Sequence, residues 1–212
     1  STSVTFNWTA SSDSGSGIAG YNCQVGTTPG GSNVYDGYVG NTLTKTITGS
    51  NGNTYYCRAQ AKDNAGNLSA WSSNSNGIMV DNVAPTAPGA PTDAGTYSTS
   101  STLTFTWTAS TDSGSGVAGY NCRIYSTTTG TDVFNGYAGN VLTKTFTVPQ
   151  DAAYYCQVQA KDNVGNLSSW SSWSNGIRVD TVVPTTPGVP TDAGAYTNST
   201  SVTFNWTASS DT

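Results

Sequence analysis

The sequence contains no histidine and no glutamate, and its twelve acidic residues are all aspartates. A general base would therefore have to be an aspartate or a lysine, and the aspartates fall in turn sequences where they cap the backbone. Charged residues make up 9% of the chain, and no apolar run approaches the length of a membrane span. We therefore expect no enzyme activity, no cofactor and no membrane insertion.

The small number of basic residues also bears on the partners. Seven Lys and Arg against twelve Asp give a net charge of −5, which repels phosphate backbones, so we expect no nucleic-acid partner. The chain is nevertheless rich in large side chains, with 6 Trp, 12 Tyr and 5 Phe. These can build a core, and the 24 glycines among many Ser, Thr and Asn favour short strands joined by turns.

An internal repeat organises the whole chain. A shift of 99 residues superimposes Trp8 on Trp107 and Trp206, and it aligns the cysteines and the prolines without a gap. Agreement improves at a shift of 198, where "STSVTFNWTASSD" returns in full at 199–211. The repeating unit is therefore predicted to be a pair of alternating domains.

Proline-rich linkers separate the repeats. The stretches "VDNVAPTAPGAPTDAG" (80–95) and "VDTVVPTTPGVPTDAG" (179–194) each carry three prolines spaced by three residues. This spacing favours an extended and fairly stiff connection. The predicted domains are 1–83, which lacks its first strand segment, a complete domain at 84–182, and 183–212, which holds a linker and the first strands of a third repeat.

Hydrophobic residues alternate with polar ones inside each repeat. In "VTFNWT", Val4, Phe6 and Trp8 share one face while Thr5 and Asn7 share the other. Turn signals such as "SDSGSG" and "DNAGN" separate such runs, and no helical stripe of useful length occurs. The pattern predicts an all-β sandwich in each repeat.

One stretch departs from this alternation. In "TLTKTIT", Lys45 falls on the same face as Leu43 and Ile47. Either a β-bulge shifts the register at this point or the lysine snorkels at an edge.

These features together resemble fibronectin type III domains, particularly bacterial extracellular ones. The resemblance rests on the Trp of the second strand, "GY" at the start of the third, and "Y-x-C-x-A-x-A" followed by "KDNAGNLSAWS" at the sixth. It implies that Trp8 and Trp107 fill the core. It also implies that Tyr55 and Tyr154 are the corner tyrosines before the sixth strand.

Cysteine is where the chain departs from that family. Cys23 and Cys57 lie in strands that the resemblance makes neighbours, and Cys122 and Cys156 repeat the arrangement. Residues at paired positions of neighbouring strands are within disulfide reach, so we predict one bridge per domain and an oxidising compartment. The alternative is two buried free thiols acting as small hydrophobes.

Several polar residues are candidates for modification or metal binding. Sequons mark five glycosylation candidates, Asn7, Asn67, Asn166, Asn198 and Asn205. The alternative for "DNAGN" is that the asparagine serves the turn. Four aspartates at the linkers, Asp81, Asp93, Asp180 and Asp192, are weak calcium candidates. Strand-end capping and linker solubility explain them as well.

The motif "WSSWS" at 170–174 matches a signature of class I cytokine receptors. The first repeat has "WSSNS" in its place, and arginine is sparse on the strand next to it. We therefore interpret the motif as local packing.

Gapless repetition with stiff linkers favours a structural role. The first hypothesis is the shaft of an extracellular or cell-surface fibre, filament or adhesin stalk, glycosylated and in contact with neighbouring repeats or subunits. The alternative is a spacer or carbohydrate-binding module of a secreted polysaccharide-degrading enzyme, with Tyr38 and Tyr137 as candidate sugar-stacking rings. A third possibility is a protomer that completes its sandwich with a strand of the next subunit.

Overall fold

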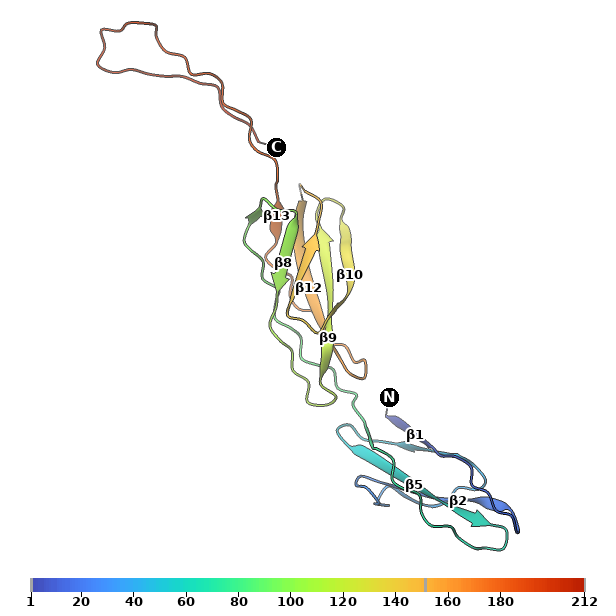
Figure 1. The fold of residues 1–212 in the computed structure, drawn as a ribbon. Helices are drawn as coiled ribbons and strands as arrows, with labels where there is room; N and C mark the ends of the chain where they lie inside the picture. Colours follow the sequence, from blue (N-terminus) through green and yellow to red (C-terminus); the bar gives the residue numbers. More distant parts are fainter. Residues whose placement is uncertain (1, 151, 212) are drawn as a thin grey trace. The chain divides into compact units, whose positions relative to one another are not determined.

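A computed structural model describes residues 2–150 and 152–211, and this part of the chain contains strands and no helix (Figure 1). It therefore contains no helix long and apolar enough to cross a membrane. The first repeat has six strands: β1 (Ser3–Asn7), β2 (Ile18–Gly26), β3 (Tyr35–Tyr38), β4 (Thr44–Thr48), β5 (Thr54–Asp63) and β6 (Ile78–Met79). The second repeat has seven: β7 (Tyr97–Ser98), β8 (Thr102–Thr106), β9 (Val117–Ser126), β10 (Thr131–Gly139), β11 (Thr143–Thr147), β12 (Ala152–Asp162) and β13 (Ile177–Val179).

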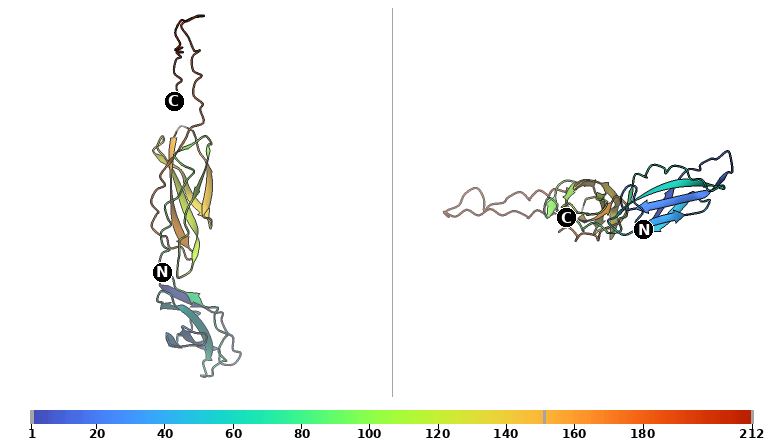
Figure 2. Two further views of the ribbon diagram at one scale, coloured as in Figure 1. Left: turned by 90° about the vertical axis from the view of Figure 1, so that its left-hand side faces the viewer. Right: turned by 90° about the horizontal axis from the view of Figure 1, so that it is seen from below.

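Each repeat folds its strands into two sheets. In the first repeat β1 pairs with β4, and the other sheet has the order β3-β2-β5-β6. In the second repeat β8 pairs with β11, and the other sheet has the order β10-β9-β12-β13-β7 (Figures 1 and 2). The predicted all-β sandwich class is confirmed.

The core lies between the two sheets of each repeat. Val4 and Phe6 of β1 pack with Cys23 and Val25 of β2 and with residues of β5. The predicted alternation is confirmed, since the side chains of β1 are alternately exposed and buried. Trp107 is buried as expected, but Trp8 is only half-buried and packs at the rim of the core.

The irregular position of Lys45 has a direct explanation. β1 and β4 pair in one unbroken register, in which Phe6 lies opposite Lys45, so no bulge occurs. The Lys45 Nζ atom lies 3.4 Å from the centre of the Tyr35 ring. A cation–π contact with this ring therefore stabilises the lysine ammonium group on the inward face.

The corner tyrosines adopt the predicted geometry. The hydroxyl of Tyr55 accepts a hydrogen bond from the Ser50 backbone N–H at 2.8 Å. The hydroxyl of Tyr154 donates to the Pro149 carbonyl at 2.7 Å. In both cases a buried phenol is bonded to the backbone five residues upstream, as the resemblance implied.

The proline-rich linker is part of a ladder rather than a free tether. Pro85, Pro88 and Pro91 are buried, and the residues after them supply the donors that proline lacks. Thr86 N–H donates to the Thr111 carbonyl at 2.9 Å, and Thr92 N–H donates to the Thr106 carbonyl at 2.8 Å. We name residues 84–98 the leading segment of the second repeat.

A serine ladder covers one edge of the long strand β5. The backbone N–H groups of Ser69, Ser72 and Ser75 donate to carbonyls of β5, and their hydroxyls accept from backbone N–H groups of the same strand. Ser168, Ser171 and Ser174 repeat the ladder along β12. The backbone N–H and carbonyl groups along this edge are thus hydrogen-bonded although no continuous strand pairs with it.

The "WSSWS" motif belongs to this ladder and packs locally. The guanidinium of Arg123, on β9, lies 4.7 Å from the centre of the Trp173 ring. In the first repeat Arg58 lies 5.0 Å from the centre of the Trp71 ring. The arginine that stacks on Trp173 was missed because it comes from β9, far away in the sequence.

Residues 183–211 form a hairpin of extended backbone with one isolated bridge, Thr191 to Asn205. The strand predicted around Phe204 and Trp206 stays exposed. The equivalent strands β1 and β8 pair with β4 and β11, about forty residues further along, and the sequence given holds no such residues.

The described chain divides into two compact units. The first takes the residues up to Pro88 together with Ser110–Tyr120 and Gln159–Trp170. The second takes Gly89–Ala109, Asn121–Val158 and the residues from Ser171 on. The site described next lies within the first unit.

Candidate functional site: a cluster of three aspartates

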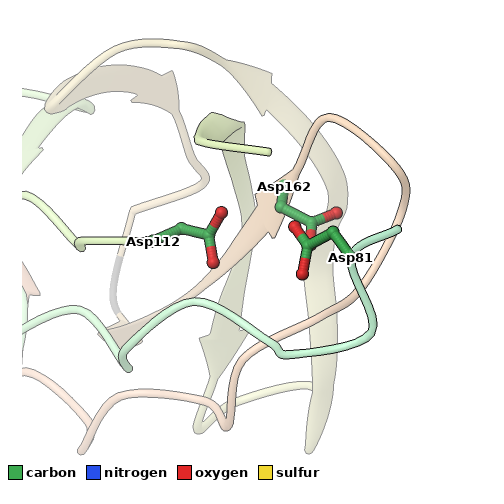
Figure 3. A group of neighbouring side chains, drawn as sticks. All are labelled: Asp81, Asp112 and Asp162. Carbon is green, nitrogen blue, oxygen red and sulfur yellow. The ribbon is translucent and has the colours of Figure 1, made fainter. Parts of the chain in front are cut away.

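Three carboxylates that are far apart in the sequence meet in the first compact unit. Asp81 follows the last strand of the first repeat, Asp112 lies in the loop before β9, and Asp162 ends β12. One carboxylate oxygen from each lies within 4.8 Å of the others, and Figure 3 shows the three side chains directed toward one another. Asp81 is 5% exposed and Asp162 is 1% exposed.

The turn "DNVGN" holds Asp162 in place. Its Oδ1 atom accepts hydrogen bonds from the backbone N–H groups of Val164, Gly165 and Asn166, at 3.0, 2.6 and 2.8 Å. Its Oδ2 atom accepts from the Asn166 side-chain amide at 2.7 Å. Gly165 has a φ of +101°, which side chains rarely adopt, so glycine is required where the turn closes over the carboxylate.

The loop before β9 wraps closely around Asp81. Ser115 N–H donates to Asp81 Oδ2 at 2.6 Å, and Val83 N–H donates to Oδ1 at 3.1 Å. A Cβ atom on Gly114 would lie 2.4 Å from the Asp81 carboxyl carbon, so this close approach needs glycine. Hydrogen bonds from Ser115 and then from Val83 hold the pKa of Asp81 below its ordinary value, and the carboxylate is ionised at neutral pH.

Asp112 is only partly satisfied by hydrogen bonds. Its Oδ2 atom accepts from the Gly116 N–H at 2.6 Å. Its Oδ1 atom is buried and has no hydrogen-bond partner among the described residues. In the part of the chain at 2–150 and 152–211, no lysine or arginine forms an ion pair with any of the three aspartates.

This donor set suits hard cations better than any catalytic step. All the side-chain donors are carboxylate oxygens, which are the ligands that calcium and magnesium prefer. The carboxylates are tied to backbone amides, and the described cluster contains no thiol or imidazole.

One member of this cluster was predicted from the sequence. Asp81 belongs to it, whereas Asp93, Asp180 and Asp192 each accept a hydrogen bond from the backbone N–H two residues further on. Asp112 and Asp162 were missed because they lie in loops distant from the linker. The signal that could have found them is the repeat itself, since both recur at a shift of 99 residues, as Asp13 and Asp63.

The cysteine pairs lie close together as thiols. The sulfur atoms are 3.5 Å apart for Cys23 and Cys57, and 3.4 Å apart for Cys122 and Cys156. Cys23 lies opposite Ala59, and Cys57 lies opposite Val25. The assumption that Cys23 and Cys57 occupy directly paired positions was therefore wrong, because the two are diagonal neighbours on one face.

Burial and the contact between the two sulfurs decide the protonation of these thiols. The shared hydrogen bond, followed by burial, raises the pKa of Cys23 and of Cys156, whereas the hydrogen bond with Cys23 lowers the pKa of Cys57. Cys23 and Cys156 are therefore neutral at physiological pH and are poor nucleophiles. The disulfide bridges stay a prediction.

The glycosylation candidates fall into two groups. Asn7, Asn198 and Asn205 have exposed side chains. Asn67 and Asn166 use their side-chain amide nitrogens to donate to Asp63 and Asp162, both at 2.7 Å. In these two the nitrogen that would carry a glycan is engaged in the turn, which supports the turn interpretation.

Exposed aromatic rings occur at the predicted positions and at a second place. Tyr38 and Tyr137 are about half exposed, and the Tyr38 hydroxyl donates to the Ala19 carbonyl at 2.8 Å, so its ring is held at the edge of β2. The sequence analysis missed a shallow hollow of about 360 Å³ lined by Tyr125, Tyr155 and Trp173.

Comparison with known proteins finds a chitinase and an exoglucanase among the relatives of this chain. No family model matches the chain. The chain is 39% identical to chitinase A1 of Niallia circulans over 96% of its length, and 35% identical to exoglucanase B of Cellulomonas fimi over 88%. It spans only 28% and 16% of the length of these two relatives.

Two solved structures are similar at low sequence identity. One contains the fibronectin(III)-like modules of Clostridium thermocellum CbhA, with a TM-score of 0.46, 16% identity, and coverage of 84% of this chain and 85% of that one. The other contains chicken CNTN1 domains FN1–FN3, with a TM-score of 0.48, 18% identity, and coverage of 81% and 61%.

Proposed function

We propose that this chain, a tandem of fibronectin type III-like domains, is a non-catalytic spacer within a polysaccharide-degrading enzyme. The observation that carries the proposal is the difference between the share of this chain that aligns with its relatives and the share of each relative that aligns with this chain. Nearly the whole chain aligns with a chitinase and an exoglucanase, yet it accounts for about a quarter or less of each. Most of each relative therefore lies outside the part that resembles this chain.

The chemistry of the chain agrees with a non-catalytic role. It has neither histidine nor glutamate, Cys23 and Cys156 are buried with raised pKa values, and the clustered aspartates are bound to backbone amides. A spacer needs only a stable fold and an ordered connection, and the leading segment supplies the second, since its prolines alternate with residues that are hydrogen-bonded to the following repeat.

The proposal replaces the fibre as the leading hypothesis. The fibre reading rested on the gapless repeat, and a spacer made of several domains explains the same repeat. The named relatives act on polysaccharide, whereas nothing in their names refers to a filament. An enzyme for an insoluble polymer has to meet it outside the cell, so the proposal also places the chain there.

The experiment that tests the spacer uses the polypeptide encoded by the whole gene. It is compared with a variant that lacks residues 2–182. We expect hydrolysis of a soluble oligosaccharide to stay unchanged and hydrolysis of the insoluble polymer to fall, since only the second reaction depends on the reach of the catalytic domain. A gene that encodes further repeats and no catalytic domain would contradict the spacer and favour the fibre.

A second candidate function, contact with the polysaccharide itself, is favoured by the aromatic hollow of the second repeat. Tyr125 and Trp173 lie with ring centres 6.0 Å apart, and Trp173 is 38% exposed although Arg123 stacks on it. Flat aromatic faces beside a few polar groups suit the apolar faces of sugar rings.

The first repeat provides the matched control for this contact. Gly26 and Asn74 occupy the positions of Tyr125 and Trp173 there, so the hollow is specific to the second repeat. We expect Trp173→Ala to reduce the fraction of the chain that sediments with insoluble chitin or cellulose, and Asn74→Ala to leave it unchanged. Equal sedimentation of both variants and the parent chain would exclude a role for the hollow.

A further inference from the structure

We infer that Asp81, Asp112 and Asp162 bind one calcium ion, which fastens the start of the linker to two loops of the second repeat. The inference does not depend on the proposed spacer function. It rests on the geometry of the three carboxylates, on a buried carboxylate oxygen of Asp112 that has no partner among the described residues, and on the recurrence of the same aspartates along the chain.

The spacing of the carboxylates fits a single ion. Calcium lies 2.3–2.6 Å from its oxygen ligands, so two ligands on opposite sides of one ion are about 5 Å apart. The three carboxylate oxygens here lie within 4.8 Å of one another, and the side chains converge from three separate segments (Figure 3). Their positions are set in advance by hydrogen bonds from Ser115, Gly116 and the 164–166 turn.

An unpartnered buried oxygen in the loop before β9 points independently to a ligand. Asp112 Oδ1 is buried without a hydrogen-bond partner among the described residues, although its carboxylate faces the cluster. Buried polar atoms are rarely left in this state, and a bound ion would satisfy this oxygen.

The donor types select calcium among the common cations. Zinc prefers nitrogen and sulfur ligands, and the described cluster offers only carboxylates. Magnesium demands a near-ideal octahedron and gives up its water reluctantly, whereas calcium accepts irregular sets of six to eight oxygens.

The repeat carries the same aspartates elsewhere and so provides an internal control. Asp112 corresponds to Asp13, and Asp162 corresponds to Asp63. The counterpart of Asp81 would precede the first residue of the sequence given, so in this chain the first repeat has two of the three carboxylates. The 212-residue chain should therefore have one calcium site made of all three aspartates, and the two aspartates of the first repeat should bind calcium more weakly.

The experiment is calorimetric titration of the EDTA-treated 212-residue chain with calcium chloride. We expect one ion per chain, with a dissociation constant of about 10⁻⁴–10⁻³ M as in extracellular modules. The substitution Asp112→Asn should weaken binding at least about tenfold, and the matched control Asp13→Asn should leave it unchanged. Circular dichroism of the calcium-free variants shows that both are folded, and Asp112 suits this test because it is less buried than Asp81 and Asp162.

Thermal unfolding supplies a second measurement. Calcium that binds the folded chain alone raises the unfolding temperature by an amount that grows with the logarithm of its concentration once that exceeds the dissociation constant, and Asp112→Asn should remove most of that shift. An absence of binding heat together with an unchanged unfolding temperature would overturn the inference. So would equal calcium affinity in Asp112→Asn and the parent chain, or a response to magnesium or zinc in place of calcium.

Discussion

The two repeats place the same side chains in the same register and yet bury them differently. Ile78 lies opposite Tyr55, and Ile177 lies opposite Tyr154. Ile78 is 46% exposed, whereas Ile177 is 1% exposed. The second repeat has its leading segment, from which β7 pairs with β13, and the first repeat has no counterpart in the sequence given. The segment that looks like a linker in sequence thus completes the domain that follows it.

The first prediction compares these two isoleucines and has the largest expected effect. Ile177→Ala should lower the free energy of unfolding of the second repeat by about 2–5 kcal/mol, because it leaves a cavity in a closed core. Ile78→Ala should cost less than about 1 kcal/mol, because nearly half of that side chain already meets solvent. Urea denaturation measures both, and equal losses would show that the leading segment does not create the difference.

The second prediction concerns the cysteine pairs. We expect both pairs to oxidise to disulfides, each adding about 3–4 kcal/mol to stability by closing a loop of this length. The pair Cys23–Cys57 should react first, since Cys57 is 7% exposed and Cys156 is fully buried. Alkylation followed by mass spectrometry checks this. Labelling of all four thiols in oxidised protein without reductant would contradict the bridges.

The third prediction is that the two corner tyrosines contribute to stability with opposite pH dependence. Burial raises the pKa of Tyr154, whereas hydrogen bonds from the Ser50 N–H and from Asn53 lower the pKa of Tyr55. An unfolded tyrosine has a pKa of about 10. The Tyr154 contribution to stability is therefore complete below about pH 10 and is lost as the pH rises further, while the Tyr55 contribution grows as the pH rises through its lowered pKa.

The measurement is the urea midpoint of each repeat between about pH 9 and pH 11, where tyrosines titrate. We expect Tyr154→Phe to flatten the alkaline fall of the second repeat and Tyr55→Phe to remove the alkaline gain of the first. Identical pH slopes in the two repeats would contradict the assignment.

The fourth prediction has the smallest expected effect. Lys45→Met should change the stability of the first repeat by about 0.5–1 kcal/mol, since it removes the charge over the Tyr35 ring and keeps the aliphatic stem. Thermal unfolding of this variant, alone and combined with Tyr35→Leu, isolates the pairwise term. Additive effects would show that the ring contributes packing only.

The fold class could be predicted from the sequence because the alternation and the motifs that indicate it are local and occur in every repeat. Alternation placed Val4 and Phe6 inward, and the resemblance to fibronectin type III domains was enough to predict Tyr55 as the corner tyrosine. What could not be predicted was where separate segments meet. The diagonal offset of Cys23 and Cys57 depends on the register of two strands, which alternation alone leaves open.

The candidate site was predicted only in part for the same reason. Asp81 was found because it borders a linker, whereas Asp112 and Asp162 come together with it only after the loops have folded. The arrangement of Arg123 on Trp173 was hidden in the same way. In each case the missing information is a contact between residues far apart in the chain.

The serine ladder has a consequence for misfolding. Consecutive domains of similar sequence are tethered at high local concentration, which favours exchange of strands and joining of sheet edges during folding. The ladder occupies the edges of β5 and β12 with a segment from the same repeat, where serine N–H and hydroxyl groups together satisfy the strand. Each repeat thereby shields its longest strand from a neighbour of similar sequence, so that one chain can hold many copies without pairing of strands between them.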